Sequence, residues 1–284
     1  DTNMSERTVQ KIVDGQPASD GAGVELVRMI GQPALLELDP FLMLDAFRSD
    51  NPDDYIAGFP PHPHRGFETV TYLLNGRMRH KDNAGNEGVI EPGGIQWMTA
   101  GRGIVHSEMP EQQDGLLEGF QLWINLPGSH KMTPAAYQEH DDAGIPVEER
   151  AGTRIRVISG TTSQATVGPV TQPLTDPLYL DVSLDSGASF EESLPAGHNA
   201  FVYLINGSVS LPGQDGSDMT LRRDQLAVLN NGDCVRVKAG EQPSRLLLVA
   251  GKPLNEPVVR AGPFVMNTEA ELRQAFSDYQ RGEF

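Results

Sequence analysis

Alternating apolar and polar residues dominate the chain and predict an all-β fold. The segment ETVTYLLNG, residues 68–76, alternates in this way and then ends on Asn-Gly, a dipeptide that favours a tight hairpin turn. The segment NAFVYLINGSVSL, residues 199–211, has the same pattern. Because the side chains of a strand point alternately to its two faces, each segment has one face to bury. We therefore expect antiparallel strands joined by hairpins in both halves of the chain.

Two blocks of the first half recur in the second half in the same order. The motif YLLNG at residues 72–76 is followed 131 positions later by YLING, and GGIQWMTAGRG at residues 93–103 resembles RRDQLAVLNNG, 129 positions later. Nearly equal offsets favour an internal duplication, and the alternative is chance similarity between short hairpins. The segment between the halves is rich in Pro, Gly and charge, as is typical of a connector. We predict a first domain at residues 5–135, a linker at 136–149 and a second domain at 150–265.

The clearest helix lies near the C-terminus, within residues 266–284. Thr268 suits the N-cap position and Glu271 follows three residues later, as in a capping box. An apolar stripe at helical spacing then predicts a packing face, formed by Leu272, Ala275, Phe276 and Tyr279. We expect this helix to pack back on the first domain.

The 284-residue chain is strongly acidic, with 39 Asp and Glu against 22 Lys and Arg and a formal net charge of −17. Such a surface repels phosphate groups, which disfavours direct binding to nucleic acids or anionic membranes. No apolar run is long enough for a membrane span. Cys234 is the only cysteine, so no intrachain disulfide forms, and a cytoplasmic location is favoured.

Two pairs of candidate metal ligands stand two residues apart on expected strands. His62 and His64 lie in FPPHPH, and His106 and Glu108 lie in IVHSEMP. Residues i and i+2 of a strand share a face, so the four side chains converge if the two strands face each other across a β-barrel. Three imidazoles and one carboxylate suit one divalent ion: Fe, Mn, Co, Ni, Cu or Zn. A six-coordinate ion would keep two positions open for chemistry, whereas a closed tetrahedral zinc would be structural.

These segments resemble the pirin family of two-domain cupins, or bicupins. The resemblance rests on PPHPHRGFETVTYLLNGRMRHKDNAGNEG, QWMTAGRGIVHSEMP, GFQLWINLP, HKMTPAAYQ and GPFVMNTEAELRQAFSDYQRGEF. It implies two antiparallel jelly-roll β-barrels with a short C-terminal helix, and one iron ion, Fe(2+), held in the first barrel by His62, His64, His106 and Glu108. Glu68 stands where many other cupins keep a carboxylate ligand and is the alternative to Glu108.

The duplication also predicts a second domain without metal. At the repeat offsets, His62 and His64 correspond to Ser193 and Pro195, and the ligands of the second pair correspond to valines, Val235 and Val237. The remaining histidines are expected to be ordinary core or surface residues: His80, His130, His140 and His198.

The resemblance implies two functions, which the sequence does not separate. Some pirin-like proteins cleave flavonols such as quercetin with dioxygen, so the chain is a candidate quercetin 2,3-dioxygenase in which Glu108 takes the substrate proton. Gln121, in GFQLWINLP, matches a family position near the metal cavity and is a candidate substrate-binding residue. Other pirins are regulators that act through a protein partner, with the oxidation state of the metal as the switch. A deep apolar cavity that opens onto the metal would favour the enzyme.

Overall fold

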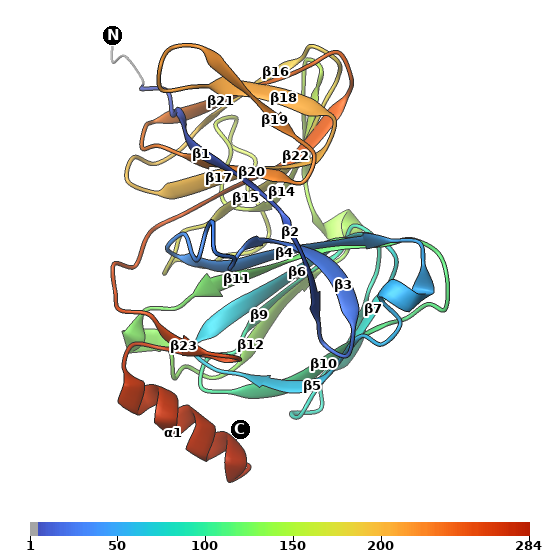
Figure 1. Cartoon of the computed structure of the whole chain (residues 1–284), viewed down its shortest axis with the longest axis vertical. Helices are drawn as coiled ribbons and strands as arrows, with labels where there is room; N and C mark the ends of the chain where they lie inside the picture. Colours follow the sequence, from blue (N-terminus) through green and yellow to red (C-terminus); the bar gives the residue numbers. More distant parts are fainter. Residues whose placement is uncertain (1–4) are drawn as a thin grey trace. The chain divides into compact units, whose positions relative to one another are not determined.

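Antiparallel strands form almost all of the regular structure, which a computed structural model describes for residues 5–284 (Figure 1). The chain divides into two units. The first, here called the site unit, comprises residues 16–32, 40–142 and 254–284. The second unit comprises residues 5–15, 33–39 and 143–253 of the described chain.

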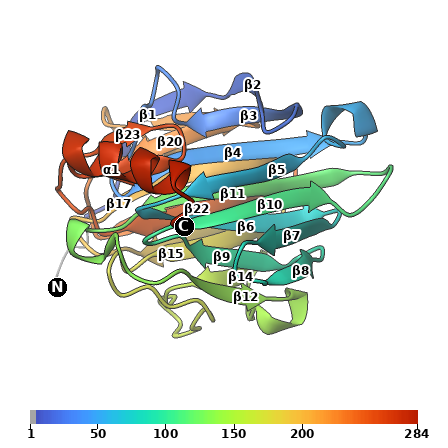
Figure 2. The same ribbon diagram turned by 90° about the horizontal axis from the view of Figure 1, so that it is seen from below.

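The site unit contains a seven-stranded and a four-stranded sheet. The large sheet has the order β12-β9-β6-β11-β4-β3-β2 and the small sheet the order β5-β10-β7-β8. Figure 2 shows β5, β10 and β7 side by side in this order. The strands are β2 (Gln16–Asp20), β3 (Val24–Ile30), β4 (Phe41–Ser49), β5 (Phe59–His64), β6 (Phe67–Asn75), β7 (Met78–Asp82), β8 (Glu87–Ile90), β9 (Ile95–Thr99), β10 (Ile104–Pro110), β11 (Leu117–Asn125) and β12 (Ala136–His140).

The second unit repeats this arrangement. Its large sheet has the order β1-β20-β17-β22-β15-β14-β13 and its small sheet the order β16-β21-β18-β19. The strands are β1 (Val9–Asp14), β13 (Val147–Arg150), β14 (Thr153–Ser159), β15 (Leu178–Leu184), β16 (Ser189–Ser193), β17 (Asn199–Asn206), β18 (Ser208–Pro212), β19 (Asp218–Arg222), β20 (Gln225–Leu229), β21 (Cys234–Ala239) and β22 (Ser244–Gly251).

The order of the strands agrees with the predicted duplication. The small sheets correspond strand for strand, and β9-β6-β11-β4 of the site unit corresponds to β20-β17-β22-β15. The all-β, bicupin prediction is therefore confirmed, with one difference: the sheets are open at their edges and do not close into a barrel. The core of the second unit combines apolar side chains of both its sheets, for example Val202 and Leu248 with Val235 and Val237.

The C-terminal part of the site unit consists of β23 (Val259–Ala261), β24 (Phe264–Met266) and α1 (Glu269–Gln280). Thr268 is the N-cap of α1, because its hydroxyl accepts the backbone N–H of Glu271 at 3.1 Å. The predicted apolar face is right for its buried members, Leu272 and Ala275, but Phe276 and Tyr279 stay 39% and 41% exposed. Their rings contact Phe264 edge-on, with centroids 4.8 Å and 6.3 Å from that of Phe264.

Three short 3-10 helices complete the described chain: η1 (Pro52–Asp54), η2 (Gly128–His130) and η3 (Asp142–Gly144). Strand β1 pairs with β20 in the second unit, whereas the sequence prediction placed it in the first domain. The alternation of residues along a strand does not indicate which distant strand it pairs with, so this pairing could not be predicted from the sequence. No helix among residues 5–284 has the length and apolar character to cross a membrane.

Candidate metal centre

Three histidines meet where β5 and β10 pair. His62 lies directly opposite His106 in the antiparallel register, and His64 lies opposite Ile104. One ligand atom from each imidazole lies within 4.8 Å of those of the other two. The ring centroids of His62 and His64 are 4.7 Å apart, and those of His64 and His106 are 5.0 Å apart. The structure thus brings together the three histidines that the spacing singled out.

The two strands do not face each other across a barrel, as the sequence argument supposed. β5 and β10 are hydrogen-bonded neighbours in the small sheet. Directly opposed residues on antiparallel strands point to the same face and lie close together. The pairing therefore places His62 beside His106 without any contribution from a second sheet. A register irregularity follows His106, so that Glu108 is opposite Phe59.

The protonation of the histidines suits metal binding. His62 Nδ1 donates to the carbonyl of Pro60 at 2.7 Å, which leaves the lone pair of Nε2 free; metal-ligating histidines commonly have such a partner on the other ring nitrogen. Burial lowers the pKa of His64 well below its usual value, and the neighbouring His106 and His62 lower it further. Burial also lowers the pKa of His106 to about 4, although Glu108 opposes this. Neutral imidazoles are the form that binds metals.

Glu108 adjoins the histidine group and is held by two hydrogen bonds. Its Oε1 lies 3.7 Å from His106 Nε2 and accepts from Gln121 Nε2 at 3.0 Å. Its Oε2 accepts from the hydroxyl of Thr71 at 3.1 Å. Thr71 is on β6 and Gln121 is on β11. Glu108 therefore connects the small sheet to the large one, and its carboxylate has a fixed orientation.

The residues present fit a divalent cation. His106 Nε2 is buried and has no hydrogen-bond partner among the described residues, yet it faces a carboxylate oxygen at 3.7 Å. Bonds from a transition metal to nitrogen or oxygen are about 2.0–2.2 Å long, so one ion can bind both atoms. The three grouped imidazoles, with the Glu108 carboxylate beside His106, offer nitrogen and oxygen donors, which suit iron, manganese, cobalt, nickel, copper or zinc.

Glu68, the alternative carboxylate, lies on the other face of β6. Thr71 and Phe67 face the candidate centre, since Thr71 binds Glu108 and the Phe67 ring is 5.1 Å from that of His64. Side chains alternate along a strand, so Glu68 points away. Its Oε2 instead accepts from the hydroxyl of Thr99 at 2.6 Å.

The remaining histidines lie outside the three-histidine group. His80 is buried, and its Nε2 is 3.0 Å from a carboxylate oxygen of Glu139. His130 Nδ1 is 2.8 Å from the hydroxyl of Ser129. His140 lies on β12 and His198 lies in the second unit. None of the four adds a donor to the group.

Two members of the site were not singled out by the sequence analysis, namely Thr71 and Trp123. Trp123 Nε1 donates to Gln121 Oε1 at 3.2 Å, and the Trp123 and His64 ring centroids are 5.4 Å apart. Gln121 is opposite Thr71 in the pairing of β11 with β6. The alternation of β11 could have indicated that Gln121 and Trp123 share a face, but only the pairing shows that this face meets Glu108.

A pocket of about 670 Å³ opens onto two of the three histidines, His62 and His64. His62, His64 and Gln121 contribute to its lining, and apolar walls come from Phe59, Met43 and Trp123. Ligand pockets commonly combine apolar walls with a few polar groups that fix orientation. The pocket opens onto candidate metal ligands, but Asp20, Arg28 and Arg260 also line it, so it is only partly the apolar cavity that would favour an enzyme.

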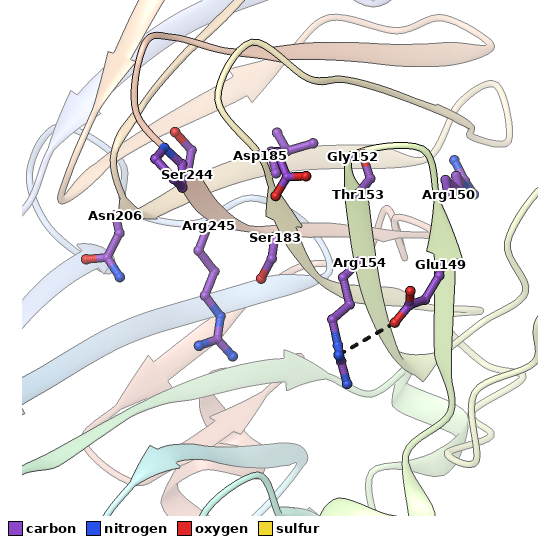
Figure 3. A pocket seen from close by; sticks show the side chains of 12 residues that line it. Glu149, Arg150, Gly152, Thr153, Arg154, Ser183, Asp185, Asn206, Ser244 and Arg245 are labelled. Carbon is purple, nitrogen blue, oxygen red and sulfur yellow. Dashed lines mark ion pairs between the residues drawn. The ribbon is translucent and has the colours of Figure 1, made fainter.

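The second unit differs at the corresponding positions. Val235 and Val237 are fully buried in its apolar core, and their side chains carry no donor atom. A pocket of about 530 Å³ in this unit is lined by charged and polar residues (Figure 3). Its arginines already have carboxylate partners, since Arg154 lies 3.6 Å from Glu149 and Arg245 lies 2.6 Å from Asp181.

Comparisons with known proteins find related families for both halves of the chain. Residues 23–124 match the family described as Pirin, and residues 179–284 match the family described as Pirin C-terminal cupin domain. A pirin-like protein of Caulobacter vibrioides is 54% identical, over 99% of this chain and 100% of that protein. Human pirin is 43% identical, over 98% of this chain and 94% of that protein.

A solved structure shows the same likeness over nearly the whole chain. The quercetin 2,3-dioxygenase of Acinetobacter baumannii superposes with a TM-score of 0.89 and is 33% identical. The match covers 99% of each chain.

Proposed function

Because this chain belongs to the pirin family, we propose that it is a mononuclear metal protein whose ion is iron(II), held by His62, His64, His106 and Glu108. The observation that carries the proposal is the buried, unpartnered His106 Nε2 facing the Glu108 carboxylate beside two further imidazoles. The apolar positions in the second unit support one metal ion per chain, bound in the site unit. The single cysteine, which is free, supports a cytoplasmic location.

We propose that the activity is cleavage of quercetin or a related flavonol by dioxygen. This substrate class comes from the relative in Acinetobacter baumannii, a quercetin 2,3-dioxygenase. The pocket of about 670 Å³ has room for such a molecule. Its apolar walls would hold aromatic rings, while the polar base at His62 and Gln121 would receive a hydroxyl group.

The residues of the chain have separate roles in this proposal. When bound, the ion supplies Lewis acidity toward an ionised hydroxyl and redox chemistry toward dioxygen. Glu108 is the general base that takes the proton of the substrate hydroxyl. Gln121 and Thr71 donate to its two oxygens and so keep the carboxylate oriented. Trp123 in turn donates to Gln121, which sets the direction of the amide.

Oxygen uptake tests the activity directly. Iron(II)-loaded protein is mixed with quercetin, and oxygen consumption, quercetin loss and carbon monoxide release are followed together. We expect the three quantities to rise in parallel in the wild type and to vanish in His106→Ala. If the iron-loaded wild type consumed no oxygen with any flavonol tested, the dioxygenase proposal would be refuted. The alternative would then be a redox-responsive regulator that acts through a protein partner. A pull-down that compares the iron(II) and iron(III) forms of the protein would test for such a partner.

A further inference from the structure

Arg65, the residue that follows His64, is a buried cation tied to the C-terminal helix. Its side chain is 2% exposed, and its Nη1 donates to Asp278 Oδ2 at 2.8 Å. The side chain of Asp278 is 12% exposed. Removing one partner of a buried ion pair leaves an uncompensated charge, which is strongly unfavourable. The pair therefore constrains both the strand end at His64 and the helix α1.

Two further contacts hold the Arg65 guanidinium in one orientation. Its Nε donates to the carbonyl of Arg102, and its Cζ lies 4.5 Å from the centroid of the Phe284 ring, a cation–π geometry. The Phe284 carbonyl also accepts from Asn83 Nδ2 at 2.9 Å. One residue of α1, Asp278, and one after it, Phe284, thus contact the side chain of Arg65.

The backbone next to His64 is joined to the same C-terminal segment. Arg65 N–H donates to the carbonyl of Pro263 at 3.3 Å, and Val265 N–H donates to the carbonyl of Arg65 at 3.0 Å. A Cβ on Gly66 would lie 2.0 Å from the carbonyl oxygen of Val265, so the two segments are in close contact. Consecutive side chains of a strand point to opposite faces. The contacts of Arg65 with the C-terminal segment therefore fix the backbone beside His64, whose side chain points to the candidate metal centre.

We propose that Asp278 is a positioning residue for the metal centre. Through Arg65 it holds His64 in the orientation that binds metal, so docking of α1 and metal binding stabilise each other. This inference rests on the proposed metal site. Coupling between two sites is reciprocal, so a variant that loosens the helix must bind metal more weakly, and bound metal must protect the helix from opening.

The first test measures metal affinity without any enzyme turnover. Mn²⁺ is titrated into the metal-free protein, and the electron paramagnetic resonance signals of free and bound Mn²⁺ are recorded. Loss of a residue that orients a metal ligand typically weakens affinity about 10–100-fold. We expect such a loss in Asp278→Asn, together with a changed spectrum of the bound ion. The control Glu269→Gln removes a charge from an exposed position of the same helix and should match the wild type.

Two outcomes of this titration are informative in different ways. If Asp278→Asn lowered only the melting temperature of the metal-free protein and left Mn²⁺ affinity and spectrum unchanged, the ion pair would be merely structural and the inference overturned. If the wild type and His106→Ala bound Mn²⁺ equally, the metal site itself would fail, and this inference with it.

The second test uses the wild type and so does not depend on the folding of a variant. Amide hydrogen exchange of α1 is measured by mass spectrometry with and without Mn²⁺. We expect Mn²⁺ to slow exchange across Glu269–Gln280 in the wild type and to have no effect in His106→Ala. Equal exchange in the wild type with and without saturating Mn²⁺ would overturn the coupling.

Discussion

His62 and His106 are direct cross-strand partners on β5 and β10, with ring centroids 4.4 Å apart. Their relation depends on the register of the small sheet, because a shift by one residue would turn one of the two rings to the opposite face. The backbone ladder therefore sets the relative position of the two imidazoles. The same ladder places Glu108 beyond a register irregularity, where it can reach the large sheet.

Replacing His106 by Ala should abolish high-affinity metal binding, because it removes the donor that faces both His62 and Glu108. Elemental analysis of purified protein is expected to show about one metal ion per wild-type chain and much less in the variant. His130→Ala is the matched control, since His130 lies outside the histidine group and should keep its metal. Equal metal content in wild type and His106→Ala would contradict the assignment.

Replacing Glu108 by Gln should separate metal binding from proton transfer. The amide keeps an oxygen donor but loses the basic charge, so part of the metal should remain while quercetin turnover falls by about 10²–10⁴-fold, as for loss of a general base. Glu68→Gln is the control, because Glu68 is also a buried carboxylate that accepts a hydrogen bond from a threonine, Thr99. We expect metal content to be unaffected there. Full turnover in metal-loaded Glu108→Gln would show that Glu108 is not the base.

Replacing Gln121 by Leu should loosen the carboxylate of Glu108 and leave the indole N–H of Trp123 without its acceptor. Loss of a residue that hydrogen-bonds to a metal ligand commonly lowers metal affinity about 10–100-fold. We expect a loss of affinity in this range when metal is titrated into Gln121→Leu. Gln96→Leu is the comparison, because Gln96 donates to Glu139 instead. An unchanged affinity in Gln121→Leu would mean that Glu108 does not need this support.

Lys131 predicts a distinct dependence of stability on pH. Its ammonium is buried and donates to three oxygens, those of Gly66, Asn125 and Val265, and burial lowers its pKa from 10.5 to about 8. Between these values the unfolded chain binds more protons than the folded one, so the unfolding free energy rises with pH, by roughly 3 kcal/mol at most. Below the folded pKa this contribution is constant.

Urea unfolding of the wild type and of Lys131→Met, measured between pH 7 and pH 11, isolates this effect from other titrating groups. We expect the unfolding free energy of the wild type, minus that of Lys131→Met, to increase with pH in that window. A difference that stays constant would indicate that the pKa of Lys131 is not lowered.

Gly66 and Gly85 together test how the turn after His64 is held. Both have positive φ, +95° and +90°, which costs about 1–3 kcal/mol for another residue. A Cβ at Gly66 would also meet the Val265 carbonyl oxygen at 2.0 Å, whereas one at Gly85 meets nothing within 4 Å. Gly66→Ala should therefore lower the urea midpoint clearly more than Gly85→Ala. Equal urea midpoints of the two variants would show that the segment around Val265 can move to accommodate the new Cβ without loss of stability.

Local patterns in the sequence were enough to predict the strands, the repeat, the cap of α1 and the two pairs of candidate ligands. These features are local: alternation has a period of two residues, and i, i+2 spacing puts His62 with His64 on one face whatever lies beside the strand. The capping residue Thr268 acts within one helical turn. Such patterns can be recognised without knowing any partner.

The neighbours of each strand, and the residues that support the candidate ligands, became known from the folded structure alone. The pairing of β5 with β10, the contacts of Thr71 and Gln121 with Glu108, and the addition of β1 to the second unit all join distant segments. Arg65 and Asp278 are 213 residues apart, and each reads locally as an ordinary charged residue. Which distant segments become partners depends on which surfaces are buried together in the folded chain. No repeating pattern along the sequence indicates that pairing.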